Sequence, residues 1–345
     1  MTILHVPVRN FKQIIYMETN EITDTPVVTG ETPFLTAPFR GKNAFWRYFL
    51  GGVAPFLVSN IIGAIPLAVV MISYTLDGSP LPQKGGMPDF ELMGIDLNLG
   101  FALTLFPFIL AFFTIVWLIR PLHNRSFGTV INGGRKVRWG RMLFSAFLWV
   151  AISAVWLFYS VRTDPGNFSL NNTTGTLLIL ASLSLLLIPF QAAFEEILFR
   201  GYLMQGFAVL ARNRWVPMVT TSLLFGLMHS LNPEVREYGF MTMIPQYIFF
   251  GLVFAVLTLL DDGIELAIGA HTANNAFLSV FVTHKDSALQ TPAMYEQLEI
   301  YPWKDFAGLV VMSLAFVIIM AVVYRWKDIR RVYARITVSD VVDAG

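Results

Sequence analysis

Residues 193–203 read AFEEILFRGYL, and they follow the uncharged apolar run TGTLLILASLSLLLIPFQ at residues 174–191. Two adjacent carboxylates, Glu195 and Glu196, and then the cation Arg200 therefore stand in a segment that is otherwise apolar. An ionised side chain at the centre of a bilayer costs about 2.5–3.5 kcal/mol on insertion scales. If this segment crosses a membrane, the three charged side chains must face the interior of a helical bundle or a water-filled cavity.

The composition of the whole chain indicates an integral membrane protein. Of the 345 residues, 55% are hydrophobic and only 14% are charged, whereas soluble domains carry roughly 25% charged residues. The mean hydropathy is +0.60. The chain contains no cysteine, which excludes disulfides and thiolate metal sites. We expect the lipid bilayer as a partner, and no nucleic acid.

Eight segments are long and apolar enough, or nearly so, to cross a bilayer, which requires about 20 mainly apolar residues. They are expected near residues 45–74, 98–120, 142–161, 175–208, 215–230, 241–260, 264–283 and 306–325. The sequence therefore predicts an all-α fold, a polytopic transmembrane helix bundle of about eight spans. The fourth segment is too long for one straight crossing, so we expect it to tilt, bend or split.

Arginine and lysine gather in alternate loops, which predicts the orientation of the bundle. They precede the first span, fill the loop after the second, and follow the fourth and the last, as Arg47, Arg138, Arg212 and Arg331 illustrate. Because cytoplasmic loops are enriched in these residues, eight spans place both termini in the cytoplasm. The loop that begins at Asp261 is acidic although it is predicted to be cytoplasmic.

The acidic residues of that loop are Asp261, Asp262 and Glu265. We interpret them as a solvated turn followed by a helix start, where carboxylates are favoured by the helix dipole.

Three apolar segments carry polar side chains that can face inward. Glu196 and Arg200 are four residues apart, so they share one helical face and can pair, which leaves Glu195 without a local partner. The stretch LLFGLMHS places His229 in the fifth segment. The stretch AIGAHTANNAFL places His271 and Asn275 on one face of the seventh segment, among small residues that let helices approach closely.

A carboxylate, two imidazoles and an amide in apolar helices have a common chemical use. A carboxylate and an imidazole can take a proton from water and so make a nucleophile. An imidazole and an amide can donate to the oxyanion that forms at an attacked carbonyl. Alternatively, Glu195, His229 and His271 could bind a divalent, zinc-like ion with an open position for water, although the HExxH signature is absent. The residues alone do not choose between these two versions.

The motifs carry a family resemblance. EEILFR matches EExxxR, FGLMH matches FxxxH, and HTANN matches HxxxN. Their order and spacing resemble the CPBP family of intramembrane proteases, also called the type II CAAX prenyl endopeptidase or abortive-infection family. The resemblance covers about residues 175–285. From composition and the apolar segments we expect a polar N-terminal extension (1–40), a transmembrane domain (41–335) that contains this protease core, and a C-terminal tail (336–345).

The resemblance implies a role for each matching position. Glu195 would be the general base that activates water, and His229 would assist it. His271 and Asn275 would stabilise the oxyanion. Glu196 and Arg200 would orient the site. Members of the family are named metalloproteases, and a metal-free glutamate mechanism is also proposed for them.

The expected activity is an intramembrane endopeptidase that cleaves a peptide or protein, either a prenylated CAAX-type substrate or a bacteriocin-like peptide. A bacterial plasma membrane fits this multi-pass chain better than a eukaryotic membrane. Two alternatives remain: a non-catalytic immunity or scaffold protein of the same fold, and a transporter. Transporters often show repeat symmetry, and no internal repeat is visible in this sequence.

Overall fold

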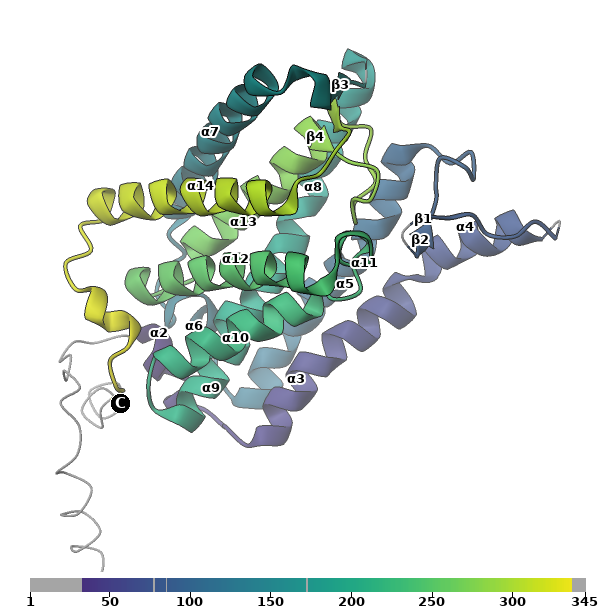
Figure 1. Cartoon of the computed structure of the whole chain (residues 1–345). Coiled ribbons are helices and arrows are strands. Elements are labelled where there is room, and N and C mark those ends of the chain that lie inside the picture. Colours follow the sequence, from purple (N-terminus) through teal and green to yellow (C-terminus); the bar gives the residue numbers. More distant parts are fainter. Residues whose placement is uncertain (1–32, 77, 85, 172, 337–345) are drawn as a thin grey trace, which may run out of the picture.

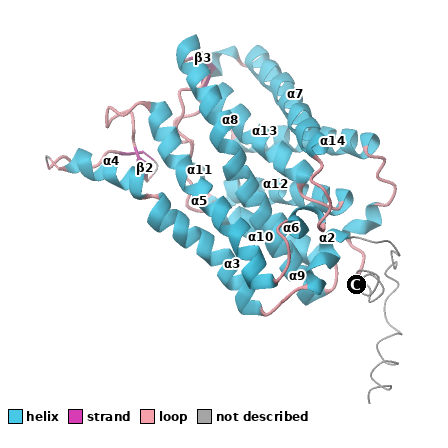
Figure 2. Ribbon diagram, turned by 180° about the vertical axis from the view of Figure 1, so that it is seen from behind, coloured by secondary structure: helices cyan, strands magenta, loops and turns pink. Residues whose placement is uncertain are grey.

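The computed structural model describes residues 33–76, 78–84, 86–171 and 173–336. Nearly all of its regular structure is helical (Figure 2). The long helices are α3 (Phe45–Val58), α4 (Ile65–Thr75), α5 (Leu97–His123), α7 (Trp139–Thr163), α8 (Thr174–Glu196), α9 (Met204–Ala211), α10 (Trp215–Met228), α12 (Phe240–Asp261), α13 (Glu265–Phe281) and α14 (Pro302–Val323). The fold is therefore the predicted transmembrane helix bundle.

Short elements connect and interrupt these helices. Single helical turns are α2 (Pro33–Thr36), η1 (Ala37–Arg40), α6 (Gly128–Asn132), η3 (Pro165–Asn167), α11 (Pro233–Tyr238) and η5 (Ile329–Val332). Two wide π-helical segments, η2 (Ser59–Gly63) and η4 (Ile197–Leu203), join α3 to α4 and α8 to α9. The strands are β1 (Gln83–Lys84), β2 (Met87–Pro88), β3 (Phe168–Leu170), β4 (Val282–Thr283) and β5 (Tyr295–Gln297). Strand β5 pairs with β3 in the antiparallel and with β4 in the parallel sense.

Helix α13 lies at the centre of the bundle. It packs against α7 on one side and α8 on the other, and it also contacts α12 (Figure 1). Helix α8 in turn packs against α5, and α5 packs against α3. Helix α10 lies between α9 and α12. Three core clusters of buried apolar side chains fill the space between these helices.

The connections gather at two opposite ends of the bundle, as the predicted alternation of loops requires. At one end, which we call the arginine end, Phe34 donates to Asp262, Lys42 donates to the carbonyl of His123, and Arg214 donates to the carbonyl of Ala334. At the other end, which we call the strand end, Gln290 donates to the carbonyl of Pro88 and Tyr238 donates to Asp286. Strands β3, β4 and β5 also lie there (Figure 1).

All eight expected segments are helical. Within the described residues, six helices are long and apolar enough to cross a membrane: Phe45–Thr75, Leu97–His123, Trp139–Thr163, Thr174–Ala211, Phe240–Asp261 and Pro302–Val323. The other two, α10 and α13, have 14 and 17 residues. The chain is therefore a multi-pass membrane protein, while the count of eight crossings and the cytoplasmic termini stay predictions.

The long fourth segment bends without breaking. It continues from Thr174 to Ala211, and its middle, Ile197–Leu203, is a π-helix. A π-helix adds about one residue to a turn, and such turns often lie at functional sites. The EExxxR motif therefore coincides with the irregular part of this helix.

Residues 33–40 lie against the arginine end. Phe34 and Leu35 of α2 are buried in the largest core cluster, and Gln205 of α9 donates to the carbonyl of Phe34 at 2.7 Å. Residues 1–32 of the predicted extension and residues 337–345 of the predicted tail lie outside the described residues.

The interpretation of Asp261, Asp262 and Glu265 as solvated residues is wrong. All three are buried, because the loop before α7 brings arginines to them. Arg135 pairs with Asp262 at 2.8 Å, and Arg138 pairs with Asp261 at 3.0 Å. Isolated buried carboxylates would carry a large desolvation cost, so these ion pairs are what allows the loop to close over the end of α13.

Gly269 explains how α13 approaches α7 so closely. A Cβ atom at this position would collide with the carbonyl oxygen of Met142 and come within 3.1 Å of Ser145 Cβ. The side chain of Ser145 donates to the carbonyl of Leu266 across the same contact. The expectation that small residues let this helix pack closely is confirmed at this position.

We therefore expect Gly269→Ala to destabilise the bundle by about 1–3 kcal/mol, the typical cost of overpacking a core. Thermal unfolding of the detergent-solubilised protein measures this loss. The matched control is Gly175→Ala in α8, where a Cβ meets nothing within 4 Å. Equal unfolding midpoints for the two variants would contradict the close contact between α7 and α13.

Candidate functional site

A cavity of about 570 Å³ contains the expected site residues. Its polar lining includes Glu195, His229, His271 and Asn275, together with side chains that the sequence analysis did not select. Much of the remaining lining is apolar: Phe56, Leu105, Pro107, Phe108, Phe194, Phe199, Met228, Phe250 and Leu278. The cavity also reaches Met87 of β2 and the loop residue Thr291 at the strand end.

Glu196 is the centre of the charge balance in this site. Its side chain is fully buried, and its Oε1 accepts from Arg200 Nη1 at 2.8 Å and contacts His271 Nδ1 at 2.7 Å. The predicted pairing of Glu196 with Arg200 is therefore present. One carboxylate oxygen links the π-turn after α8 to the middle of α13.

Arg200 is buried among aromatic rings. Its guanidinium lies 4.1 Å from the centre of the Phe225 ring and 5.5 Å from that of Phe254. Such cation–π contacts are attractive, more so in a desolvated setting. Phe225 thus does more than fill space, because it covers a buried cation and contacts the rings of His229 and His271.

Glu195 faces the cavity on the neighbouring side of the helix. One of its oxygens accepts a hydrogen bond from Gln191, one turn earlier. The other oxygen, Oε2, lies 3.7 Å from His271 Nε2 and accepts no hydrogen bond from the described residues. The side chain is 12% exposed. Glu195 therefore lines the cavity and keeps one buried carboxylate oxygen, Oε2, that accepts no hydrogen bond within the described part of the chain and lies beside His271.

Hydrogen bonds fix which nitrogen of each histidine carries a proton. His271 Nδ1 contacts the Glu196 carboxylate, and His229 Nδ1 contacts the carbonyl oxygen of Phe225 at 2.7 Å. Carboxylate and carbonyl oxygens only accept, so Nδ1 is the donor in both rings. Nε2 of each neutral ring then carries a lone pair, and the Nε2 of His271 faces Glu195.

His229 is held from both sides. Its ring stacks on Tyr247, with ring centres 4.2 Å apart and planes 17° apart, and its other neighbour is Phe225. The hydroxyl of Tyr247 donates to Glu234, which also accepts from Asn232. His229 is the first residue after α10, and Pro233 begins α11 shortly afterwards. The end of α10 therefore places the imidazole at the wall of the cavity.

Asn275 belongs to a chain of hydrogen bonds that runs in one direction. Trp149 Nε1 donates to Asn274 at 3.2 Å, Asn274 donates to Asn275 at 2.9 Å, and Asn275 donates to Gln191 at 2.9 Å. Gln191 then donates to Glu195. An indole only donates and a carboxylate only accepts, so the two ends fix the orientation of the three amides between them. The side-chain amide of Asn275 has a second N–H, which takes no part in this series of hydrogen bonds.

The described residues contain no group of three or more histidine, aspartate or glutamate side chains that could hold a metal ion. The alternative set of Glu195, His229 and His271 lines one cavity, but these side chains are not gathered as ligands. The arrangement thus does not fit a preformed three-ligand centre.

Several residues of the cavity were missed by the sequence analysis: Gln191, Asn274, Tyr247 and Glu234. Trp149, which donates to Asn274 from outside the cavity lining, was missed as well. Gln191 had a detectable signal, since it is a polar residue one helical turn before Glu195 in an apolar run. Asn274 adjoins the recognised Asn275. Trp149, Tyr247 and Glu234 reach the site only through tertiary contacts, so no local pattern indicates them.

Comparison with known proteins agrees with this geometry. A family model described as Type II CAAX prenyl endopeptidase Rce1-like matches residues 176–277, a range that contains every residue of the three motifs. The chain is also 32% identical over 261 residues to the "Uncharacterized protein YyaK" of Bacillus subtilis (strain 168), an alignment that covers 72% of this chain and 82% of that protein. No solved structure matches.

The fold and the site are those of a multi-pass membrane protein that holds a glutamate, an arginine and a histidine in contact inside an apolar helix bundle. The chain belongs to the Rce1-like family of type II CAAX prenyl endopeptidases.

The shared oxygen of Glu196 generates a stability prediction. Glu196→Leu leaves the buried Arg200 without its carboxylate, and breaking a buried pair in this way typically costs about 3–5 kcal/mol. We expect a clear drop in the unfolding midpoint of the detergent-solubilised protein. Removing both charges in Glu196→Leu/Arg200→Leu should recover part of the loss, because no buried charge is then unpaired. A double variant less stable than Glu196→Leu would contradict this account.

Proposed function

We propose that this protein is an intramembrane endopeptidase in which Glu195 activates water. The observation that supports the proposal is that Glu195, whose Oε2 accepts no hydrogen bond from the described residues, lines one cavity together with His271 and Asn275. The Oε1 atom of Glu195 accepts from Gln191, whereas its Oε2 atom has no hydrogen-bond partner among the described residues. This carboxylate is suited to hold a water molecule and to remove its proton.

The proposed reaction is a direct attack of water on a peptide carbonyl. Glu195 takes one proton from water as the oxygen forms a bond to the carbonyl carbon. The C–N bond then breaks, and the same proton passes from Glu195 to the leaving nitrogen. His229 lines the same cavity as Glu195, and its Nε2 lone pair can accept a hydrogen bond from the attacking water.

The oxyanion would be stabilised by Asn275 and His271. The unused N–H of Asn275 is a donor whose direction is fixed by the chain from Trp149 to Glu195. His271 can donate from Nε2 only when both ring nitrogens carry protons, since Nδ1 is committed to Glu196. The carboxylates of Glu195 and Glu196 on either side of the ring offset the charge of that doubly protonated form. Glu196 and Arg200 act as positioning residues.

The lining of the cavity supports an apolar substrate. Side chains of α3 and α5, including Phe56, Leu105 and Phe108, extend the apolar wall away from the polar groups. This wall could accommodate a hydrophobic peptide or the lipid of a prenylated one. We place the protein in a bacterial plasma membrane, a choice supported by its similarity to a Bacillus subtilis protein.

The first test is cleavage by the purified protein in detergent. We expect wild type to cleave a prenylated CAAX-type peptide or an unlipidated apolar peptide, and Glu195→Gln to lose at least about 10²–10⁴ in rate. This substitution keeps the acceptor for Gln191 and removes only the base. Glu237→Gln, a change of an exposed carboxylate at the strand end, is the matched control and should keep wild-type activity.

The outcomes separate the alternatives. Loss of cleavage in Glu195→Gln with full activity in a strong chelator supports the metal-free mechanism. Loss in the chelator, restored by added zinc, supports a metal enzyme instead. Full activity of Glu195→Gln contradicts the assigned base. Binding of the peptides without cleavage by wild type would favour a non-catalytic family member.

A second prediction about activity concerns the hydrogen-bonded side-chain amides of Asn274 and Asn275. Asn275→Ala should lower kcat by about 10²–10³ with little change in KM, as loss of an oxyanion donor typically does. Asn274→Ala should have a smaller effect on kcat, because Asn274 orients Asn275 and does not reach the substrate. Steady-state kinetics of both variants measure the difference. Equal losses in kcat would rule out direct donation by Asn275.

A further inference from the structure

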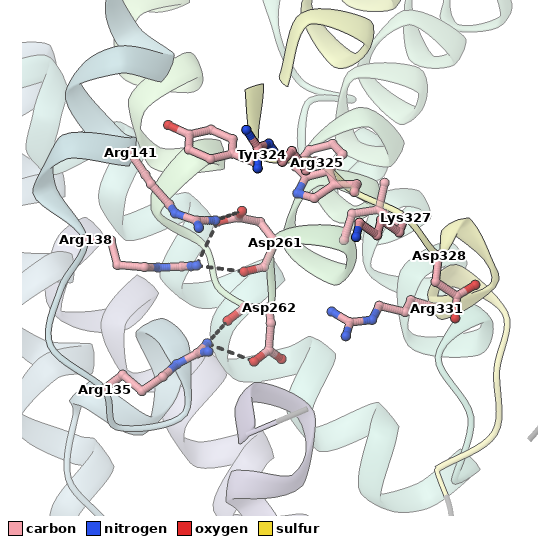
Figure 3. Close-up of a pocket in the computed structure, with 12 residues that line it drawn as sticks. Arg135, Arg138, Arg141, Asp261, Asp262, Tyr324, Arg325, Lys327, Asp328 and Arg331 are labelled. Atoms are coloured by element: carbon pink, nitrogen blue, oxygen red, sulfur yellow. Dashed lines mark hydrogen bonds and ion pairs between the residues drawn. The ribbon is translucent and has the colours of Figure 1, made fainter. Parts of the chain in front are cut away.

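A second cavity lies at the arginine end, about 450 Å³ in volume and outside the proposed active site. It opens where α7 begins and where α12 and α14 end (Figure 3). Its charged lining comprises Arg135, Arg138, Arg141, Asp261, Asp262, Arg325, Lys327, Asp328 and Arg331. Six cations thus face three carboxylates, which leaves an excess of three positive charges.

The three carboxylates are already paired. Arg138 and Arg141 hold Asp261, Arg135 holds Asp262, and Arg330, beside the cavity, holds Asp328 at 3.0 Å. Figure 3 shows Arg135, Arg138 and Arg141 on one side with their contacts drawn as dashed lines.

The opposite side of the cavity carries the surplus charge. Arg325, Lys327 and Arg331 form no ion pair within the described part of the chain. Arg331 is near enough to Asp262 to interact electrostatically, but it lies beyond ion-pair distance. We call these three residues the basic triad.

The end of α14 fixes the position of the basic triad. The backbone N–H of Trp326 bonds to the carbonyl of Ala321, and Arg325 adopts a left-handed conformation with φ of 52°. This is the Schellman arrangement of a helix C-terminus, which turns the chain sharply. Trp326 then packs against a core cluster, so the turn is anchored and the basic side chains are held around the cavity.

The location of the cavity identifies the kind of ligand. Three apolar helices end at its rim, which places it at the level where the hydrocarbon core meets water. Tyr324 and Trp326 line it, as aromatic residues do at that level. Basic pockets between transmembrane helices on the cytoplasmic side bind anionic lipid headgroups, and arginine matches phosphate geometry especially well.

We propose that the basic triad binds the phosphate headgroup of an anionic membrane lipid. The lipid phosphate takes the place of the missing carboxylates, and its acyl chains lie along α14. This site would tie the last span to the loop before α7, and it is independent of the proposed peptidase reaction.

The test uses the full-length protein in detergent and the short-chain lipid dihexanoyl phosphatidylglycerol, with dihexanoyl phosphatidylcholine and inorganic phosphate as comparison probes. Bound lipid is counted by native mass spectrometry. We expect phosphatidylglycerol to bind in preference to both other probes. The variant Arg325→Gln/Lys327→Gln/Arg331→Gln should weaken this binding by about fivefold for each cation removed.

Two controls make the result specific. Arg162→Gln/Arg236→Gln/Lys285→Gln removes the same charge from exposed positions at the strand end and should bind as wild type does. Arg325→Lys/Arg331→Lys retains the charge and should keep most of the binding even if the neutral variant folds poorly. Equal binding of phosphatidylcholine, equal loss in the strand-end control, or full competition by inorganic phosphate would each overturn the proposal.

Discussion

The fold depends on the neutralisation of charge inside an apolar bundle. Arg200 and Glu196 are both fully buried, and ionised groups in such surroundings are tolerated only when they are paired and hydrogen-bonded. By itself, this ion pair would neutralise two charges within one continuous helical segment. Oε1 of Glu196 also contacts His271 of α13, and the guanidinium lies on rings from α10 and α12. This interaction therefore determines how α8, η4, α10, α12 and α13 meet. The wide turn of η4 supplies the room for it.

Around this charged centre the polar side chains have little freedom to rearrange. The series of hydrogen bonds that links Trp149 to Glu195 begins at an indole, which can only donate, and ends at a carboxylate, which can only accept. Turning any amide over would leave two donors or two acceptors face to face, at a cost of about 1–3 kcal/mol for each buried group left unpaired. The donor of Asn275 is therefore set before any ligand arrives. Preorganised dipoles of this kind are what electrostatic catalysis requires.

The correct predictions from the sequence rested on the spacing of residues that are close together in the chain. The positions of all eight helices followed from apolar length, and the pairing of Glu196 with Arg200 followed from a separation of four residues. The contact between Glu196 and His271 joins residues 75 apart in the chain, so no periodicity could indicate it. The same limit explains the error at Asp261, Asp262 and Glu265. Their arginine partners lie more than a hundred residues earlier, and an acidic turn looks the same in sequence whether it is solvated or paired.

The polarity of α13 has a consequence for how this protein is made. Glu265, His271, Asn274 and Asn275 are polar residues of this 17-residue helix, and, like α10, it is absent from the described helices that are long and apolar enough to cross a membrane. Polar residues at mid-membrane oppose insertion of an isolated segment. The loop before α7, helix α7 and helix α8 leave the ribosome before α13. They provide its arginine, indole and glutamate partners, which are Arg138, Trp149 and Glu196. We therefore expect membrane integration of α13 to be coupled to assembly of the bundle, because the earlier parts of the chain provide the partners of the helix that carries half of the proposed site.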